Sequence, residues 1–198
     1  MATDIDKILT NLLSFYDFSK KKMISVGAGG GQLVGYAKVA GSVVAVDYDS
    51  QALDNLRKRV ETLDLSNKFS FVRSEFLDFT VKGNVLLFEF CLHEMPDPRK
   101  ALAHAKTLAT DVVVFDHYRK SEWAVYTNET KIIESAWSAI EEVKPKRVNR
   151  YNAVQKFETY EELFLKLKPL GEKVLKGIEK FKDEKNILMQ MPYSAALL

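Results

Sequence analysis

A glycine-rich stretch near the N-terminus contains the first residues whose spacing suggests chemistry. Gly27, Gly29 and Gly31 alternate directly after the apolar residues 24–26, and a helix is expected to begin at Gln32. Glycine removes the side chain where a ligand has to approach the backbone closely. A helix start behind such a turn adds free N–H groups and the positive end of a helix dipole. The stretch therefore predicts a site for a nucleotide-like cofactor.

Ionisable residues stand at the ends of four later apolar segments. The segments are residues 42–46, 69–73, 84–90 and 112–115, and the ionisable residues at their ends are Asp47, Glu75, Glu89, His93, Glu94, Asp116 and His117. An acid in the position of Asp47 can accept hydrogen bonds from both hydroxyls of a ribose. Histidine titrates near neutral pH, so His93 and His117 are candidates for moving a proton.

Short apolar segments and amphipathic helices alternate over the first two thirds of the chain. Strands are predicted at residues 23–26, 42–46, 69–73, 84–90 and 112–115, and helices at 4–18, 32–40, 50–65 and 97–108. This repetition predicts an α/β fold with a doubly wound, mostly parallel sheet. Because right-handed crossovers place the carboxyl ends of parallel strands at one edge, the glycine turn and the ionisable residues are expected to converge there.

The last third of the chain follows a different pattern. A long helix is predicted over residues 121–142, and a basic connection over 144–151 follows it. Thr159 and Glu162 have the spacing of a capping box at the start of a further helix. An antiparallel hairpin is predicted to bring the sheet to seven strands, from residues 173–181 and 186–191.

The composition is that of one globular domain spanning residues 1–198. Of the 198 residues, 46% are hydrophobic and 28% are charged, and the net charge is only +2. So small a charge argues against a nucleic acid or an anionic membrane as a partner. Within the domain, residues 1–20 are expected to hold an N-terminal helix, and residues 118–157 a helix and loop on the substrate side.

Cellular location is predicted from three absences in the sequence. Cys91 is the single cysteine, so an internal disulfide cannot form and a reducing cytoplasm is expected. The N-terminus lacks the basic and apolar regions of a signal peptide. No apolar run approaches the roughly 20 residues that span a bilayer. We expect a cytoplasmic protein, and no metal site is predicted.

The spacing of the glycines separates two cofactor classes. A dinucleotide fingerprint needs Gly-x-Gly-x-x-Gly, and counted from Gly27 and Gly29 its third glycine position holds Gln32. The form Gly-x-Gly-x-Gly fits the sequence. Four stretches in order then resemble the motifs of class I S-adenosylmethionine-dependent methyltransferases, of the type that acts on small molecules; they are residues 26–31, 44–49, 71–76 and 92–98.

The resemblance implies a role for each matching residue. The backbone of Gly27, Ala28, Gly29 and Gly31 would hold the methionine part of S-adenosylmethionine. Asp47 would bind the ribose, with Tyr48 beside the adenine. Glu75 would accept a hydrogen bond from the adenine amino group, and Phe76 would line the face of the ring. Glu89 and Phe90 would lie near the sulfonium and the methyl group that reacts.

Two positions depart from the family pattern. Ser25 stands two residues before the first glycine, where the family usually has an acid, and Asn84 opens the fourth strand, where the family usually has Asp. Without the acid at position 25, a polar anchor for the methionine end is missing. Glu89 is a hypothetical replacement for that negative charge.

The implied reaction is in-line displacement of the methyl group from the sulfonium by a nucleophile on the acceptor, with S-adenosylhomocysteine as the product. Positioning alone can lower such a barrier by about 7–11 kcal/mol at best. A base is needed only when the acceptor arrives protonated, and the candidates are His93, His117, Glu89 and Glu94.

Two other functions remain compatible with the sequence. One is an NAD(P)-binding oxidoreductase with a Rossmann fold, because such enzymes also place an acid like Asp47 on the ribose. The other is a non-catalytic protein that binds S-adenosylmethionine, which the departures at Ser25 and Asn84 would fit. A macromolecular acceptor is less favoured by the small net charge and by the lack of an added domain.

Overall fold

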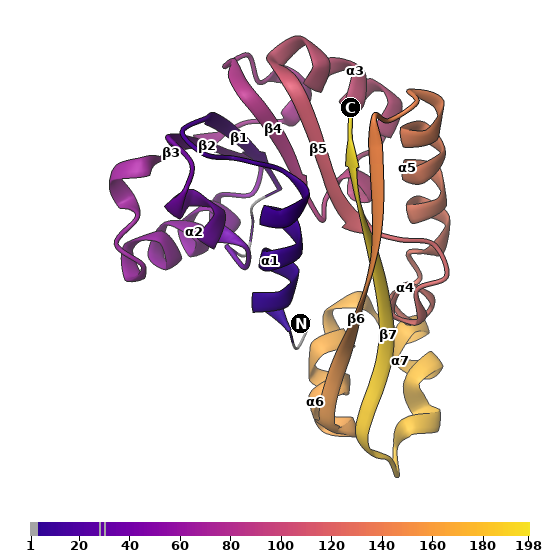
Figure 1. Ribbon diagram of the computed structural model, residues 1–198. Helices are drawn as coiled ribbons and strands as arrows, with labels where there is room; N and C mark the ends of the chain where they lie inside the picture. Colours follow the sequence, from indigo (N-terminus) through magenta and orange to yellow (C-terminus); the bar gives the residue numbers. More distant parts are fainter. Residues whose placement is uncertain (1–3, 28, 30) are drawn as a thin grey trace.

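Within residues 4–27, 29 and 31–198, which the computed structural model describes, seven strands form one sheet in the order β3-β2-β1-β4-β5-β7-β6 (Figure 1). They are β1 (Lys22–Val26), β2 (Ser42–Asp47), β3 (Phe69–Arg73), β4 (Gly83–Glu89), β5 (Ala109–His117), β6 (Arg147–Thr159) and β7 (Lys185–Leu197). The first five strands pair in parallel, and β7 is antiparallel to both of its neighbours. The predicted fold class, a mostly parallel seven-stranded sheet with an antiparallel C-terminal pair, is confirmed.

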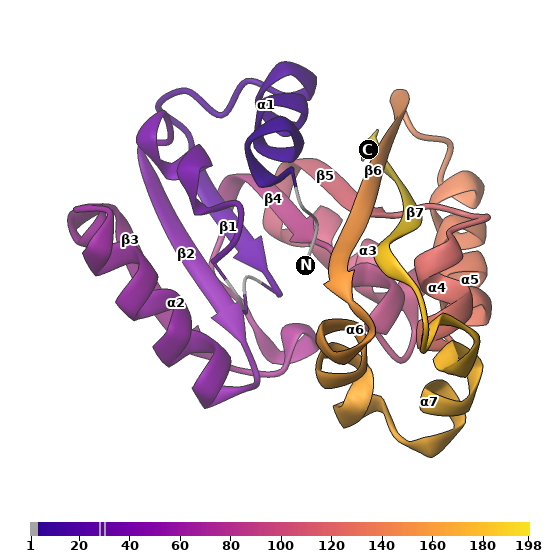
Figure 2. The same ribbon diagram turned by 90° about the horizontal axis from the view of Figure 1, so that it is seen from below.

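Helices cover both faces of the sheet, as its nearly continuous apolar strands require. The main helices are α1 (Ile5–Phe15), α2 (Ser50–Thr62), α3 (Pro98–Leu108) and α5 (Thr130–Glu142). The side chains that α1 and α2 bury lie in one hydrophobic core, together with Met23 of β1. The side chains that α3 and α5 bury lie in a second core, together with Ile24. Figure 2 shows the helices in these two layers. Because successive side chains of a strand point to opposite faces of the sheet, they pack in two separate cores.

Local capping signals set where several helices begin. Asp4 accepts a hydrogen bond from the Lys7 N–H at 3.2 Å, and Asp97 accepts one from the Lys100 N–H at 3.1 Å. Such side-chain caps satisfy backbone donors that have no partner inside the helix. For α2 the cap is Asp49, whose side chain accepts a hydrogen bond from the Gln51 N–H.

The segment after the glycine turn is not the predicted α-helix. Residues Val34–Lys38 form a short 3₁₀ helix, η1, in place of a helix over 32–40. Gly35 explains part of the difference, because a Cβ there would lie 2.5 Å from Leu9 Cδ2 of α1. The close packing of α1 thus needs a residue that also weakens an α-helix. No extended helix dipole is directed at the turn.

The long helix predicted over 121–142 is two helices. The first, α4 (Glu122–Thr127), ends at Asn128, which has the left-handed φ of +65° that asparagine tolerates. The second, α5, begins two residues later and buries Ile133, Trp137 and Ile140. The break turns α4 toward the carboxyl edge of the sheet.

Two further predictions for the C-terminal third are wrong. Residues 144–151 are not a connection, because β6 begins at Arg147, and residues 173–181 are not a strand but contain α7 (Glu172–Ile178). Val174 and Ile178 are buried at a spacing of four, which is a helical spacing. The substrate-side loop predicted within 118–157 is likewise a strand over most of its length.

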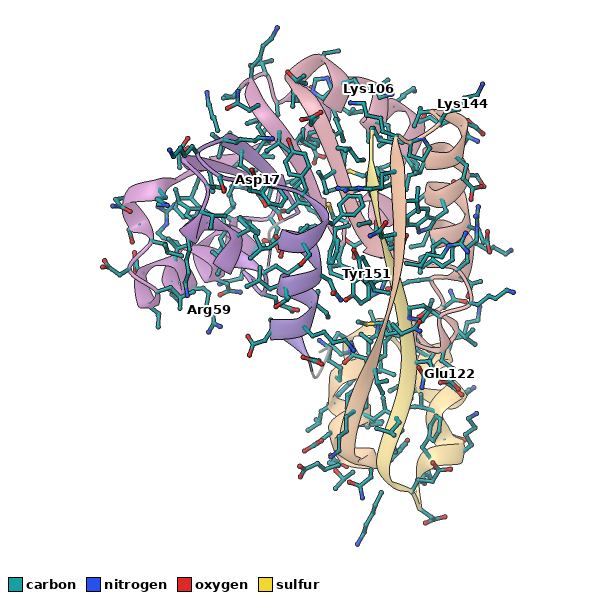
Figure 3. All side chains as sticks on the ribbon, in the orientation of Figure 1. Asp17, Arg59, Lys106, Glu122, Lys144 and Tyr151 are labelled. Carbon is teal, nitrogen blue, oxygen red and sulfur yellow. The ribbon has the colours of Figure 1, made fainter. Side chains whose placement is uncertain are left out.

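The pair β6–β7 extends beyond the rest of the sheet, with α6 (Tyr160–Leu167) and α7 at its far end (Figure 1). The start of α6 follows the predicted capping box, since Thr159 Oγ1 accepts from the Glu162 N–H at 3.4 Å. Tyr151 of β6 lies on the side that faces α1 (Figure 3) and stacks on Tyr193 of β7 at 5.2 Å. This extension adds a wall beside the carboxyl edge of the sheet.

None of the helices in the described part of the chain has the length and hydropathy needed to cross a membrane.

Candidate active site

A cavity of about 740 Å³ lies at the carboxyl ends of the parallel strands. One part of it is lined by the ends of β1, β2 and β4, and the other part by α1, α4, β6, α6 and β7. Its lining residues include Gly27, Gly29, Asp47, Tyr48, Glu75, Phe76, Glu89, Phe90, His93, His117, Trp123, Glu129, Gln155, Lys166 and Met191. The volume lies within the range of about 300–1,000 Å³ typical of small-molecule sites.

The glycine turn is packed too tightly for side chains. Gly27 has a φ of +68°, and a Cβ there would lie 2.3 Å from Cys91 Cβ. The Cys91 thiol donates to the Val26 carbonyl at 3.1 Å and so holds the loop after β4 against the turn. At Gly29 a Cβ would lie 3.4 Å from Asp47 Oδ2. The backbone of both glycines therefore stays uncovered at the cavity surface.

Gly31, at the end of the glycine turn, does not line the cavity. It has a φ of +61° and faces α2, where a Cβ would lie 3.0 Å from Leu56 Cδ1. Ala28, predicted to contact the cofactor, lies outside the described residues, as does Gly30.

Asp47 lies half-buried at the end of β2, beside the glycine turn. Its Oδ1 accepts a hydrogen bond from the Asp49 N–H at 3.0 Å, which fixes the carboxyl group. Burial raises the pKa of Asp47. A carboxylate whose solvation is reduced in this way binds a hydroxyl donor more strongly than one in open water.

The residues predicted around an adenine lie on three sides of the same end of the cavity. Tyr48 is 67% exposed and stands at the rim, whereas Phe76 is buried and its ring meets Phe88 edge-on at 5.2 Å. Glu75 is exposed beside Phe76. The Ser74 N–H donates to the Asp47 carbonyl at 3.0 Å, so the ends of β2 and β3 are held together.

Glu89 is a buried carboxyl group in the cavity wall. Its Oε1 accepts from the Leu33 N–H at 3.4 Å, and its Oε2 is buried without a hydrogen-bond partner. Burial raises the pKa of Glu89 to about 7, against the opposing effect of the Leu33 N–H. Ser25, where the resemblance led us to expect an acid, is fully buried and shares a hydrogen bond of 2.9 Å with the Tyr36 hydroxyl.

His93 and Asp116 form a buried pair at the opposite wall. His93 Nδ1 lies 2.6 Å from Asp116 Oδ1, and the two side chains are 3% and 1% exposed. Burial by itself would lower the pKa of His93, but the charge of Asp116 and its hydrogen bond outweigh burial, and the pKa rises to about 9. The sequence analysis gave Asp116 no role of its own, and its only signal was an acid directly before His117 at a strand end.

His117 lies next to this pair, with its ring 5.3 Å from that of His93. Its Nδ1 is buried without a partner, and burial lowers the pKa of His117 to about 4. The centre of the Phe90 ring lies 5.0 Å from the centre of the His117 ring. Phe90 has a φ of +52°, a strained conformation for an aromatic residue that is held here by the Phe90 N–H bond to the Phe115 carbonyl at 2.8 Å.

The far part of the cavity contains residues that sequence analysis missed as site residues. Trp123 of α4 and Met191 of β7 are buried apolar walls. Gln155 of β6 is 4% exposed; its Nε2 contacts Met191 Sδ at 3.3 Å and its Oε1 has no partner. The alternation of Ala153, Gln155 and Phe157 could have indicated an inward glutamine, had this segment been recognised as a strand.

Unpartnered buried polar atoms are concentrated in this cavity. Over residues 4–27, 29 and 31–198, three buried side-chain nitrogen or oxygen atoms lack a partner, namely Glu89 Oε2, His117 Nδ1 and Gln155 Oε1. All three residues line the cavity. Buried polar groups are nearly always hydrogen-bonded in folded proteins, so a ligand that binds in this cavity would supply partners for these three atoms.

Part of the chain that contributes to the cavity matches a known protein family. Residues 24–111 match a protein family described as "Methyltransferase domain". This match covers the strands that carry the glycine turn, Asp47, Glu75, Glu89 and His93. No curated protein sequence matches the chain significantly.

Solved structures share the fold over nearly the whole chain. The YcgJ protein of Bacillus subtilis is 11% identical with a TM-score of 0.71, covering 97% of this chain and 98% of its own. A SAM-dependent methyltransferase from Aquifex aeolicus is 17% identical with a TM-score of 0.60, covering 98% and 89%. The magnesium protoporphyrin IX methyltransferase of Synechocystis PCC 6803, solved with bound SAH, is 11% identical with a TM-score of 0.57, covering 97% and 80%.

Proposed function

We propose that this chain is a class I S-adenosylmethionine-dependent methyltransferase that methylates a small-molecule acceptor by in-line displacement. The match of residues 24–111 to a methyltransferase domain supports this proposal. The same match favours methyl transfer over the alternative of an NAD(P)-binding oxidoreductase. The proposal concerns the acceptor, the mechanism and the residues that carry them.

The observation that carries the proposal is one cavity with two differently built ends. The end at β1 and β2 offers bare glycine backbone and a fixed carboxyl group, Asp47. The end at α4, β6 and β7 offers Trp123, Gln155 and Met191. A cofactor in the first end and an acceptor in the second would meet at Glu89, Phe90 and the two histidines.

In the cofactor end, each side chain matches one part of S-adenosylmethionine. The backbone of Gly27 and Gly29 faces the methionine part, and Asp47 accepts from the ribose hydroxyls. Phe76 and Tyr48 enclose the adenine, with Glu75 as the acceptor for its amino group. The predicted contact at Gly31 is the least supported, because this residue faces α2.

Glu89 can supply the negative charge that is missing at position 25, where the sequence has Ser25. Ser25 is bonded to Tyr36 inside the core and offers no charge to the cavity, whereas Glu89 lines the cavity with an unpartnered oxygen. We propose that the ammonium group of the cofactor pairs with Glu89. A buried carboxylate that gains a cationic partner recovers much of the cost of its burial.

The size of the cavity supports a small acceptor. Its 740 Å³ must hold the cofactor and the reacting part of the acceptor together. The acceptor end is walled by α1, α4, β6 and α6, which would exclude water from the displacement and hold the nucleophile in line with the methyl group. His93, His117 and Glu89 remain the candidates for a proton transfer, with His93 placed best.

The test uses methyl-labelled S-adenosylmethionine, the purified protein and an extract of cells of the source organism. We expect label in one small-molecule product, identified by mass, and much less label when Asp47→Ala replaces the natural protein at the same limiting concentration of S-adenosylmethionine. Label confined to RNA or protein would overturn the small-molecule acceptor. Tight S-adenosylhomocysteine binding without any labelled product would instead indicate a non-catalytic binding protein.

A cytoplasmic location remains part of the proposal, supported by the single cysteine of the sequence, Cys91, which is buried and cannot form an internal disulfide.

A further inference from the structure

We propose that Asp116 is a positioning residue that fixes His93 with its Nε2 atom as the proton acceptor for the O–H or N–H group to be methylated. This inference rests on the proposed methyl transfer and adds the class of acceptor, one that arrives with a proton on its nucleophile. The evidence for the inference is the set of hydrogen bonds made by Asp116, a residue to which no role has been assigned above.

Three hydrogen bonds leave the Asp116 carboxyl group no freedom to rotate. Oδ2 accepts from the backbone N–H of His93 at 3.0 Å, and Oδ1 accepts from the backbone N–H of His117 at 2.8 Å. The third bond joins Oδ1 to Nδ1 of the His93 ring at 2.6 Å. Because Asp116 binds both the backbone and the ring of His93, the carboxyl group fixes the orientation of the imidazole.

The same contacts determine which ring nitrogen carries the proton. Both oxygens of Asp116 already accept N–H donors, as a carboxylate does, so Nδ1 must be the donor in the short contact. Neutral His93 then has its lone pair on Nε2. This is the arrangement by which an aspartate holds a catalytic imidazole in the required tautomer. His93 lines the cavity beside Phe90 and His117.

Charged and titratable groups face His93 from each element around it. Asp116 and His117 come from β5, Glu94 from η4 (Leu92–Glu94), and Glu129 from the junction of α4 and α5. Glu94 Oε1 lies 3.9 Å from His93 Nε2. Burial opposes the imidazolium form, and the three carboxyl groups favour it more strongly, while His117 stays neutral. The imidazolium that results from taking a proton is therefore stabilised.

The proposed step conserves atoms and charge. The acceptor X–H, where X is oxygen or nitrogen, donates to Nε2 of neutral His93. X attacks the methyl carbon, the C–S bond breaks, and its electron pair stays on sulfur to give S-adenosylhomocysteine. The proton of X–H moves to Nε2, and the imidazolium pairs with Asp116 until the proton leaves to solvent.

The first experiment needs no acceptor. Nitrogen chemical shifts of the His93 ring are followed by NMR from pH 6 to 10 in the complex of the whole protein with S-adenosylhomocysteine. We expect one apparent pKa above 8, and above it a neutral ring with the proton on Nδ1. A neutral ring with the proton on Nε2 would overturn the inference, whether or not methyl transfer is found.

The second experiment compares Asp116→Asn with Asp111→Asn, using the acceptor identified from the labelled product. Asp111 lies on the same strand but at the opposite edge, bonded to Tyr16, so its variant is a matched control. For the natural protein we expect kcat to rise with pH up to about 9. In Asp116→Asn we expect a loss of about a hundredfold and a rise that ends below pH 7, with unchanged S-adenosylhomocysteine affinity.

Each outcome of this comparison is decisive. An Asp116→Asn protein with natural kcat and an unshifted pH profile would overturn the inference, as would an equal loss in Asp111→Asn. If Asp116→Asn does not fold, the tautomer of the natural protein still decides. The absence of any labelled product would overturn the proposed function instead, and would leave the Asp116–His93 geometry to the NMR result.

Discussion

Three buried ionisable side chains line this cavity, and their surroundings shift their pKa values in different directions. Glu89 accepts a hydrogen bond from the Leu33 N–H, and burial raises its pKa to about 7. His93 has a carboxyl partner and its pKa is raised to about 9, whereas His117 has none and its pKa is lowered to about 4. Three groups that titrate apart in one small space are what proton transfer and charge recognition require.

Replacing Asp47 tests the cofactor end. In Asp47→Ala the ribose hydroxyls lose a charged acceptor, so S-adenosylhomocysteine binding should weaken by about 2 kcal/mol or more. Isothermal titration calorimetry measures the change, and thermal unfolding checks that the variant is folded. Asp54→Ala on the exposed side of α2 is the control and should bind as the natural protein does. An unchanged dissociation constant for Asp47→Ala would contradict the ribose role.

Replacing Glu89 gives a pH-dependent result with a definite sign. The folded pKa of about 7 lies above the ordinary value of 4.5, so the folded state binds the extra proton between these pH values. The destabilisation is therefore absent below pH 4.5 and complete above pH 7. Glu89→Gln should melt at a higher temperature than the natural protein at pH 8, with a difference that disappears near pH 4.5.

The same variant tests the ammonium contact. In the proposed contact the ionised form of Glu89 pairs with the ammonium group, so S-adenosylhomocysteine affinity should rise between pH 6 and 8 in the natural protein. In Glu89→Gln the affinity should be lower at pH 8 and flat over this range. A variant that keeps the natural pH dependence would exclude Glu89 as the ammonium partner.

Sequence patterns identified the residues whose role is local and missed those whose role depends on tertiary pairing. Asp47, Glu75 and Phe76 follow strands within recognisable stretches, and all line the cavity. Asp116 and Gln155 become meaningful only through partners 23 and 36 residues away, His93 and Met191. No spacing rule along the chain reports such contacts.

At the scale of elements, the parallel strands were predictable and the C-terminal ones were not. The strands β1, β2, β4 and β5 are short apolar runs that are buried on both faces, and β3 at the edge of the sheet is a short run that is only partly buried. In contrast, β6 begins with the exposed residues Arg147, Val148 and Asn149 and is buried only farther along. It has no apolar run to recognise, because α1 and β7 cover it unevenly.

The glycine turn allows a matched stability test. In Gly27→Ala the left-handed φ costs about 1–2 kcal/mol, and the contact of 2.3 Å with Cys91 Cβ adds to this, so the melting temperature should fall. Gly177→Ala is the control, because a Cβ there meets nothing within 4 Å and the residue lies in α7. This variant should gain about 0.5–1 kcal/mol. Equal effects in the two variants would contradict the tight packing of the turn.

At the scale of the molecule, the cavity joins the matched region, residues 24–111, to a C-terminal part that the family match does not include. The residues of the acceptor end belong to α4, β6, α6 and β7, all outside the match. This division explains why the cofactor could be predicted from the sequence and the acceptor could not. The fold class, a mostly parallel sheet of seven strands, could be predicted from the sequence, but the elements that surround the far part of the cavity could not.

The division predicts that the two ends respond separately to mutation. Gln155→Leu removes the unpartnered amide oxygen at nearly constant volume, so it should raise KM for the identified acceptor about tenfold, the loss of one hydrogen bond. S-adenosylhomocysteine affinity should not change. Gln190→Leu, at an exposed position of the neighbouring strand, is the control. A parallel loss of cofactor affinity in Gln155→Leu would contradict the separation.

The place of β7 in the sheet has a consequence for biosynthesis. This strand lies between β5 and β6, and the Leu198 N–H bonds to the Val112 carbonyl at 2.9 Å. Strand β6 cannot join the sheet until β7 has been synthesised, although the glycine turn and its neighbouring strands can pair much earlier. Since long-range pairing is slow and domains fold from the N-terminus during synthesis, a ribosome-bound chain can acquire its cofactor end before it has an acceptor end.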